Sequence, residues 1–360
     1  MWAAPGPSLP LSRARSRKYP LPRSSKSSII VPTKGVRHIK EYIIGKNDAG
    51  QRLDRFAARV MPLMPPALLQ KYIRIKRIKC NGARCQRDQR LREGDVLQLY
   101  INDEFFEPPR EDNLFLTLFT PKLDILYEDE NILLLDKRPG LVVHPDETEK
   151  VNTLLTHLQA YLYQKREWNP REENAFAPAL CNRIDRNTGG IVIAAKNAEA
   201  LRVLTAKIRD REITKKYLCA ILGRMEPREG RLECFLLKDE KKKQVSVYHR
   251  PVPGGKSAVT LYKTLRSRGE LSLVEAELLT GRTHQIRASF ADAGHPLLGD
   301  GKYGRGEVNR RYGETRQALY SFYLRFDFPT DAGPLEYLRG REFRAPRAPF
   351  AEKYFKENTP

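Results

Sequence analysis

The sequence predicts an α+β protein in which a small basic module precedes a larger domain with a mixed, mostly antiparallel sheet. Strand-like and helix-like stretches alternate along the chain without regular β–α–β spacing, which favours the α+β class. Charge is uneven: residues 1–110 hold 23 Lys or Arg against 9 Asp or Glu, while residues 111–360 hold 42 against 35. A segment centred on two adjacent prolines, at 102–120, is typical of a linker between the two parts.

The first 36 residues are predicted to be a disordered basic tail. They are rich in Ser, Pro and Arg, residues 1–35 contain no acid, and no apolar period is visible. A transit peptide has a similar composition, although the many prolines fit an amphipathic helix poorly. An over-long translation start is a further alternative.

A compact module is expected at residues 37–101. The stretches "QRLDRFAARVM" (51–61) and "PPALLQKYIRIKR" (65–77) have apolar residues at helical spacing. The Asn-Gly pair at 81–82 is typical of a tight turn, and the stretch at 93–101 alternates like a strand. Two short helices, a turn and a strand are therefore predicted.

One face of this module is strongly basic. Between positions 71 and 92 there are nine Lys or Arg and one acid. Such a field attracts polyanions, and nucleic acid is the commonest partner; a solvated basic surface is the alternative. The candidate RNA-binding residues here are Lys71, Arg74, Lys76, Arg77 and Lys79.

The larger domain is expected at residues 121–345, followed by a C-terminal tail at 346–360. Its predicted strands are 125–127, 132–135, 191–195, 215–224 and 271–282, and its predicted helices are 153–164, 198–210 and 284–295.

Several classes of protein are disfavoured. No stretch approaches the roughly 18 apolar residues of a membrane span, so no membrane association is expected. The five cysteines are odd in number and form no CxxC pair, which argues against a disulfide framework and a zinc site and favours a reducing, cytoplasmic location. We expect no metal and no cofactor, because no GxGxxG or GxxxxGK[ST] segment is present, and we expect a monomer.

Three segments place polar groups where an apolar strand or helix begins. The first, "NRIDRNTGG" (182–190), holds one carboxylate, Asp185, close to two arginines. The others are "TKKYLCAILGR" (214–224) and the glycine-rich "LLTGRTHQIRASFADAGHPLLGDGKYG" (278–304). Asp185 is either one half of a surface ion pair or a catalytic carboxylate that its surroundings keep charged.

In their order and spacing these segments resemble the RluA-type pseudouridine synthases, whose first motif reads His-Arg-Leu-Asp-x-x-Thr-Ser-Gly. Arg183, Asp185, Thr188 and Gly190 match it, whereas Asn182 and Gly189 replace the usual His and Ser. "GRTHQIR…GHPLLGD…YG" and "LLLDKRPGLVVHP" also match. Residues 50–101, through "RLDRFAARV", "IKRIKCNGARC" and "LREGDVLQL", resemble the S4 RNA-binding domain.

The resemblance implies an enzyme that converts uridine to pseudouridine in structured RNA, with large-subunit ribosomal RNA preferred and transfer RNA possible. Asp185 would be the catalytic carboxylate and Arg287 its ion-pair partner. Tyr217 would stack on the extruded uracil and help to take the C5 proton, and Arg183 would hold the RNA around it. Whether Asp185 attacks C1′ or C6 stays open, and the two motif departures bear on loop packing or substrate choice.

The remaining candidates have simpler interpretations. We interpret His284 as a hydrogen-bonded scaffold residue on the same helix face as Arg287, and His144 and His295 as structural loop residues. A non-catalytic RNA-binding or ribosome-assembly protein on the same scaffold is the main rival function. A glycoside hydrolase is the second rival, but it would need another carboxylate near Asp185.

Overall fold

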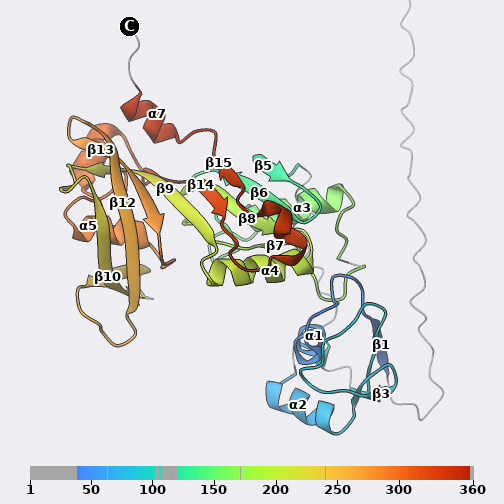
Figure 1. Cartoon of the computed structure of the whole chain (residues 1–360). Coiled ribbons are helices and arrows are strands. Elements are labelled where there is room, and N and C mark those ends of the chain that lie inside the picture. The colour runs from blue at the N-terminus through green and yellow to red at the C-terminus, as the bar shows by residue number, and fades with distance from the viewer. Residues whose placement is uncertain are drawn as a thin grey trace, which may run out of the picture. The chain divides into compact units, whose positions relative to one another are not determined.

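The structure, a computed structural model, describes residues 39–62, 64–101, 105, 106, 115, 118, 120–170, 172–239 and 241–356 (Figure 1). The predicted disordered tail at 1–36 lies outside the described residues, as does most of the predicted linker. Of the linker residues that are described, Phe106 and Phe115 are buried. None of the described helices is long and apolar enough to cross a membrane.

The N-terminal module, residues 39–101, combines two helices with a four-stranded antiparallel sheet. Its elements are β1 (Lys40–Ile43), α1 (Leu53–Val60), α2 (Pro66–Arg74), β2 (Ile78–Cys80), β3 (Ala83–Arg84) and β4 (Val96–Leu99), and the strand order is β1-β4-β2-β3. The two predicted helices are confirmed. The predicted turn is also confirmed, because Asn81 and Gly82 connect β2 to β3 with φ values of 53° and 73°.

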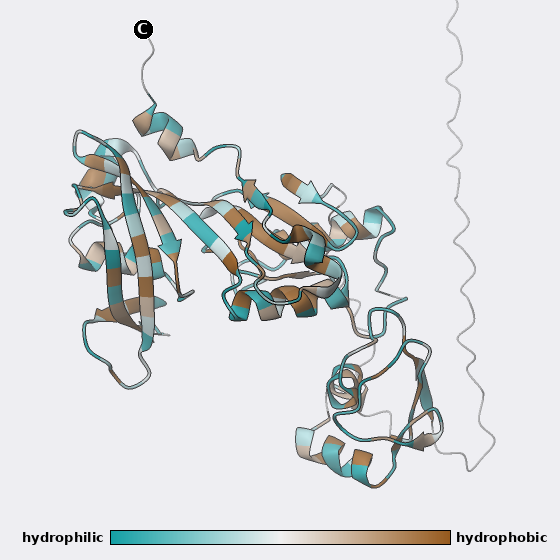
Figure 2. Cartoon of the chain, in the orientation of Figure 1, coloured by the Kyte–Doolittle hydropathy of each residue, from teal (hydrophilic) through white to brown (hydrophobic). Residues whose placement is uncertain are grey.

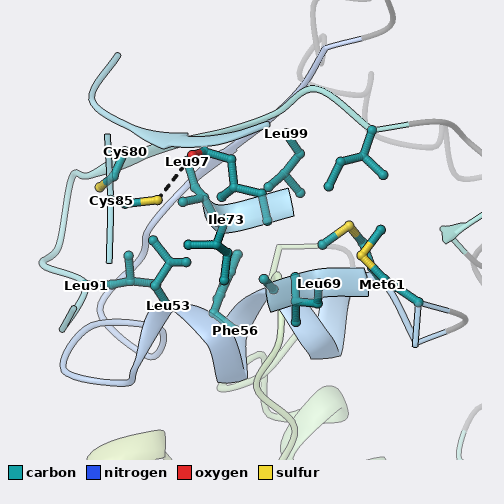
Figure 3. Packing of buried hydrophobic residues seen from close by; sticks show 14 of the residues in the cluster. Leu53, Phe56, Met61, Leu69, Ile73, Cys80, Cys85, Leu91, Leu97 and Leu99 are labelled. Atoms are coloured by element: carbon teal, nitrogen blue, oxygen red, sulfur yellow. Dashed lines mark hydrogen bonds between the residues drawn. The ribbon is translucent and has the colours of Figure 1, made fainter. Parts of the chain in front are cut away.

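The helices of this module pack one apolar face against the sheet. Leu53 and Phe56 on α1 and Leu69 and Ile73 on α2 are buried, and they meet β4 side chains such as Leu97 (Figure 3). The 3.6-residue spacing of these apolar residues is what puts them on one face. The opposite helix faces are left to the charged side chains.

The large domain, residues 120–356, is built on one 11-stranded mixed sheet. Its strands are β5 (Ile125–Glu128), β6 (Ile132–Lys137), β7 (Ala179–Leu180), β8 (Gly189–Ala195), β9 (Ile213–Leu222), β10 (Glu229–Asp239), β11 (Gln244–Tyr248), β12 (Lys256–Arg268), β13 (Leu271–Leu278), β14 (Leu319–Phe326) and β15 (Glu342–Arg344). The main order is β11-β10-β12-β13-β9-β14-β8-β6-β5. Apart from the parallel pair β14 and β8, the described pairings are antiparallel, so the predicted mixed, mostly antiparallel sheet is confirmed.

Helices pack against both ends of this sheet. They are α3 (Leu154–Gln164), α4 (Ala198–Arg209), α5 (Gln285–Asp292), α6 (Gly306–Tyr312) and α7 (Pro349–Phe355), with a 3₁₀ helix at Gly333–Leu338. The side chains of Thr153 and Asn197 accept hydrogen bonds from the N–H groups of Thr156 and Ala200, which fixes the starts of α3 and α4. α4 contacts β8, and α5 contacts β10, β11 and β12.

Two differences from the sequence prediction have physical reasons. The long strands β10 and β12 were not predicted, because in β12 Val259 and Leu261 lie on the less buried face while Thr260 and Thr264 lie on the buried face, which obscures the alternation. The expected C-terminal tail at 346–360 contains α7, whose Phe355 is buried against the sheet. Burying that aromatic ring offsets the entropy of ordering a short helix.

The neighbouring strands β6 and β8, near the β5 edge of the sheet, form a strongly apolar part of the domain. All seven residues of β8 are buried, and both strands are mostly hydrophobic in Figure 2. Strands that are covered on both faces carry continuous apolar runs rather than an alternating pattern. β8 therefore provides a rigid base for the loop that precedes it, residues 181–188.

The start of β8 approaches β14 so closely that it requires glycine. Gly189 and Gly190 pair with Tyr320 and Ser321 in the parallel register. A Cβ on Gly189 would overlap the ring of Tyr320, and a Cβ on Gly190 would overlap the backbone carbonyl of Ser321. Gly190 also has a φ of 106°, which other residues rarely adopt.

We therefore predict that Gly190→Ala lowers the free energy of unfolding by about 3 kcal/mol, because a backbone carbonyl cannot move aside as a flexible side chain can. Urea denaturation would measure the change. Gly281→Ala is the matched control, since a Cβ there meets nothing within 4 Å. Equal stability of the two variants would contradict the packing argument.

Candidate active site

Asp185 lies in the loop between β7 and β8, and the backbone of this loop is held from both sides. The N–H of Thr188 donates to the carbonyl of Asp185 at 3.1 Å, which closes a turn. The carbonyl of Arg186 accepts from the N–H of Gly140 at 2.8 Å and from Nζ of Lys137 at 2.9 Å. The carboxylate is thus carried by a turn that is tied to the segment after β6.

Lys137 is buried at the end of β6, and its ammonium group organises this connection. Nζ donates to the carbonyls of Arg138, Leu141 and Arg186 at 2.8 to 3.1 Å. Burial lowers the pKa of Lys137 to about 7, while the negative charge of Asp185 opposes the shift. Three carbonyl acceptors match the three N–H bonds of the protonated form, so the charged lysine ties the two loop segments together most fully.

The two residues that depart from the family motif have local packing roles. Oδ1 of Asn182 accepts from the N–H of Ile193 at 2.8 Å and joins the start of the loop to β8. Gly189 leaves room for the ring of Tyr320, whose hydroxyl donates to Asp136 at 2.6 Å. Both departures therefore bear on how the loop packs.

A guanidinium group from a distant helix makes the ion pair with Asp185. Nη1 of Arg287, on α5, donates to Oδ2 of Asp185 at 2.7 Å. Nε and Nη2 of the same side chain donate to the two carboxylate oxygens of Asp300 at 2.7 and 2.9 Å. One guanidinium is therefore shared between two carboxylates, one of them bidentate.

The two carboxylates differ sharply in exposure. The side chain of Asp300 is 0% exposed and that of Arg287 is 7% exposed, whereas the side chain of Asp185 is 28% exposed. Asp300 also accepts from the N–H groups of Lys302 and Tyr303 at 2.8 and 3.1 Å. Asp300 thus belongs to the scaffold, and Asp185 faces outward.

Opposing effects set the charge states in this cluster. Burial disfavours both charges, but their mutual hydrogen bonds and attraction outweigh it. They raise the pKa of Arg287 and lower the pKa of Asp300. Both groups therefore stay ionised around neutral pH, and Arg287 presents a permanent positive charge to Asp185.

This geometry leaves one oxygen of Asp185 available for chemistry. Oδ2 is bound to Arg287, while Oδ1 has no hydrogen-bond partner among the residues that the structure describes. A carboxylate that is oriented through one oxygen and open at the other can attack an electrophilic carbon or stabilise positive charge.

Tyr217 lies on β9, opposite Ser321 of β14, and is buried. Burial raises the pKa of Tyr217 to about 12, and the negative charge of Asp185 adds to the shift, against a hydrogen bond with Ser321. The phenol is therefore neutral at physiological pH. Because the charge of Asp185 acts on Tyr217, the two side chains belong to the same site. The ring of Tyr217 is nevertheless buried in this structure.

The helix that carries Arg287 starts one residue later than predicted. His284 precedes α5 as its N-cap with a φ of 53°, so it does not share the helix face of Arg287. Its Nδ1 lies 2.9 Å from the hydroxyl of Tyr303, and its Nε2 lies 3.9 Å from Oδ2 of Asp185. His284 is hydrogen-bonded, as predicted, but its second nitrogen faces the carboxylate.

The arginines beside Asp185 in the sequence do not pair with it. Arg183 is exposed, and its charge contributes to lowering the pKa of the half-buried His144, after burial itself. Nη2 of Arg186 forms an ion pair with Asp146 at 3.1 Å. Adjacent residues in a turn point in different directions, so a partner from another element was needed.

The basic candidates on the N-terminal module form a separate group. Lys71, Arg74 and Lys76 are exposed. Arg77 and Lys79 are half-buried, and their charges lie 5.0 and 5.1 Å from the ring centroids of two tyrosines, Tyr72 and Tyr100 respectively. Among the described residues, no group of three or more His, Cys, Asp and Glu could hold a metal ion.

Several known proteins are similar in sequence to this chain. Residues 131–292 match the family model described as RNA pseudouridylate synthase. An uncharacterized RNA pseudouridine synthase of Mycoplasma genitalium is 30% identical over 298 residues, covering 81% of this chain and 90% of its own length. The chain belongs to the RNA pseudouridine synthase family.

Two further known proteins are similar to this enzyme. The ribosomal large subunit pseudouridine synthase C of Vibrio vulnificus is 30% identical over 298 residues, which cover 81% of this chain and 90% of the relative. The solved structure of human RNA pseudouridylate synthase domain containing 1 has a TM-score of 0.50 at 23% identity, and it covers 65% of this chain and 86% of its own. That likeness concerns the fold.

Two residues of the site were not predicted. Lys137 stands between Asp136 and Arg138 at the end of an apolar run, and Asp300 follows Leu297-Leu298-Gly299, so each is a charge beside buried residues. Such a charge must be paired when it is buried, and this was the available signal. The side-chain partner of Asp300 lies 13 residues away, and the partners of Lys137 are backbone carbonyls. Neither could be identified from the sequence.

We predict that Asp300→Asn lowers the free energy of unfolding by about 3 kcal/mol. The neutral amide leaves the buried guanidinium of Arg287 with one carboxylate partner instead of two. We also expect kcat to fall about 100-fold, since Arg287 can then shift and misplace Asp185. Urea denaturation and tritium release from C5-labelled uridine in RNA would measure the two effects.

Asp292→Asn is the matched control. Asp292 lies on the same helix as Arg287, and its partially exposed side chain pairs with His249 at 3.3 Å. This pair is worth little because it is solvated. An Asp300→Asn enzyme as active as Asp292→Asn would show that the bidentate contact does not position Arg287.

Proposed function

We propose that this enzyme isomerises specific uridines in structured RNA with Asp185 as the nucleophile. The observation that supports this best is the outward-facing carboxylate whose one oxygen is held by Arg287, while Asp300 fixes the far side of the same guanidinium. The shared guanidinium orients Asp185 without covering its second oxygen.

The reaction explains why such a carboxylate is useful. The N1–C1′ bond of uridine breaks and its electron pair leaves with the uracil, which turns so that C5 bonds to C1′. C5 then loses its proton and N1 gains one, so the product is an isomer of the substrate. Oδ1 of Asp185 serves either by bonding to C1′ of the sugar, a bond that breaks when C5 attacks C1′, or by adding to C6 of the base, a bond that breaks again before the product leaves.

Tyr217 has a supporting role in this proposal. Because burial keeps its phenol neutral, it contacts the extruded uracil as a ring and as a hydroxyl rather than as a phenolate base. Extruding the base costs a few kcal/mol, and a target in a loop or bulge reduces that cost. Arg183, exposed on the same loop as Asp185, binds the RNA beside the extruded nucleotide.

We predict that Asp185→Asn and Asp185→Ala abolish isomerisation while RNA binding survives, because an amide or a methyl group cannot act as the nucleophile. Tritium release from C5-labelled RNA measures turnover, and filter binding measures affinity. Asp210→Asn is the control, since Asp210 lies exposed after α4 and pairs with Arg209. Retained turnover in either Asp185 variant would refute the assignment.

The substrate that we propose is large-subunit ribosomal RNA, with transfer RNA as the alternative. Support comes from the 30% identity to the ribosomal large subunit pseudouridine synthase C of Vibrio vulnificus. Pseudouridine mapping in RNA from cells with and without the protein tests this directly. A site that disappears from transfer RNA alone would replace the ribosomal assignment.

We further propose that the N-terminal module acts as an S4-like RNA-binding domain. Its support is the basic face with three exposed cations, Lys71, Arg74 and Lys76, on and just after α2. We also propose that the enzyme works as a cytoplasmic monomer; the five free cysteines are compatible with a reducing compartment.

For this module we predict a strong salt dependence. Replacing Lys71, Arg74 and Lys76 together by Ala should reduce the slope of log K against log salt by about 2 to 3, because each lost phosphate contact removes nearly one released counterion. RNA titrations at several salt concentrations measure the slope. Thermal unfolding should change little, since all three side chains are exposed. An unchanged slope would contradict the binding role.

A further inference from the structure

The ring of His284 is held beside the reactive carboxylate in an unusual backbone conformation. Its side chain is 12% exposed, and its φ of 53° lies in the left-handed region. A residue that carries a β-carbon is strained in this region, and such strain persists only where surrounding contacts fix it. Here the contact is with Tyr303, 2.9 Å from Nδ1.

The contacts of Tyr303 decide where the imidazole proton lies. The N–H of Val245 donates to the hydroxyl of Tyr303 at 2.8 Å, so that oxygen already accepts one hydrogen bond. The phenol has one hydrogen of its own, and Nδ1 of His284 is the acceptor within reach among the described residues. A neutral imidazole that accepts at Nδ1 carries its hydrogen on Nε2.

The surroundings also keep the imidazole neutral. Burial lowers the pKa of His284, and the positive charges of Arg287 and Lys302 lower it further, against the negative charges of Asp185 and Asp300. At neutral pH the ring therefore presents an uncharged N–H donor on its Nε2 side.

That donor and the carboxylate are separated by a gap of defined size. Nε2 lies 3.9 Å from Oδ2 of Asp185, which is too far for a direct hydrogen bond. A single oxygen atom fits at about 2.9 Å from both atoms. It must accept a hydrogen from His284 and donate one to Asp185, which a hydroxyl can do and a uracil carbonyl cannot.

We propose that His284 and Asp185 together bind the ribose 2′-hydroxyl of the target nucleotide, an inference that rests on the proposed uridine isomerisation. The hydroxyl accepts from Nε2 of His284 and donates to Oδ2 of Asp185. Oδ1 remains open toward the reacting carbon. His284 is thus a substrate-binding residue as well as a scaffold contact.

This contact fits the chemistry of the reaction. The 2′-hydroxyl is bonded to the carbon next to C1′, where the glycosidic bond breaks. In glycoside chemistry, hydrogen bonds to the hydroxyl beside the reacting carbon strengthen in the transition state. The same hydroxyl distinguishes RNA from DNA, so His284 would contribute to selecting RNA.

The test is a double-mutant cycle between the enzyme and the substrate. Synthetic RNA containing the uridine identified by pseudouridine mapping is made with either a 2′-hydroxyl or a 2′-hydrogen at that nucleotide. Single-turnover rates are measured for the wild type, His284→Asn and His284→Gln. The intrinsic effect of the 2′-hydrogen on glycosidic reactivity is common to all three enzymes and cancels in the cycle.

The two variants separate the two contacts of His284. An Asn side chain reaches the place of Nδ1, tolerates a positive φ and can accept from Tyr303, but it offers nothing at Nε2. A Gln side chain reaches the place of Nε2 and keeps a donor there. We expect loss of the 2′-hydroxyl to slow the wild type about 10-fold more than His284→Asn, with His284→Gln closer to the wild type.

Equal penalties in the wild type and His284→Asn would overturn the inference and leave His284 as a scaffold residue. Absence of turnover on the ribonucleotide substrate by the wild type would instead reject the proposed function. Tyr303→Phe provides a second route should His284→Asn unfold in thermal melts. Because it removes the hydroxyl that holds the proton on Nε2, it should also reduce the 2′-hydroxyl penalty.

Discussion

The guanidinium of Arg287, shared between two carboxylates, is the interaction on which the rest of the site depends. Asp300 takes two of its nitrogens and is itself fixed by two backbone N–H groups, so the third nitrogen has a defined direction. Asp185 is then oriented by a guanidinium whose position is fixed by Asp300. Because Nε and Nη2 both donate to the buried carboxylate of Asp300, that carboxylate offsets most of the desolvation cost of Arg287, and Asp185 does not have to.

The sheet is what brings these groups together across more than a hundred residues. Asp185 precedes β8, Tyr217 lies on β9, and β14 pairs with both strands. Arg287 lies on α5, which contacts β10 to β12 farther along the same sheet. Gly189 and Gly190 let β8 approach β14 without a Cβ between them. A change in that approach would therefore move the Asp185 loop relative to Arg287, even though neither glycine carries a functional group.

Sequence reasoning succeeded where a local pattern carried the information. The helices around Leu53 and Leu69 and the turn at Asn81 followed from periodicity and turn chemistry. The long strands of the antiparallel half did not, because apolar side chains on both faces, such as Phe235 and Leu236, hide the alternation and the pairing is non-local. At the site, resemblance to a motif named Asp185 and Arg287. It did not name Asp300 or Lys137, since a buried charge is explained by partners that only the folded chain brings near.

A carboxylate that follows one arginine and precedes another in the sequence is nevertheless held by neither of them. Arg186 is engaged by Asp146, and Arg183 is exposed on the outer side of the loop. This division has a physical advantage. An arginine on the same turn would move with Asp185 and could cover both of its oxygens. A guanidinium anchored on a separate helix instead fixes one oxygen and leaves the other uncovered. The neighbouring arginines then add positive potential around the loop without competing for the carboxylate.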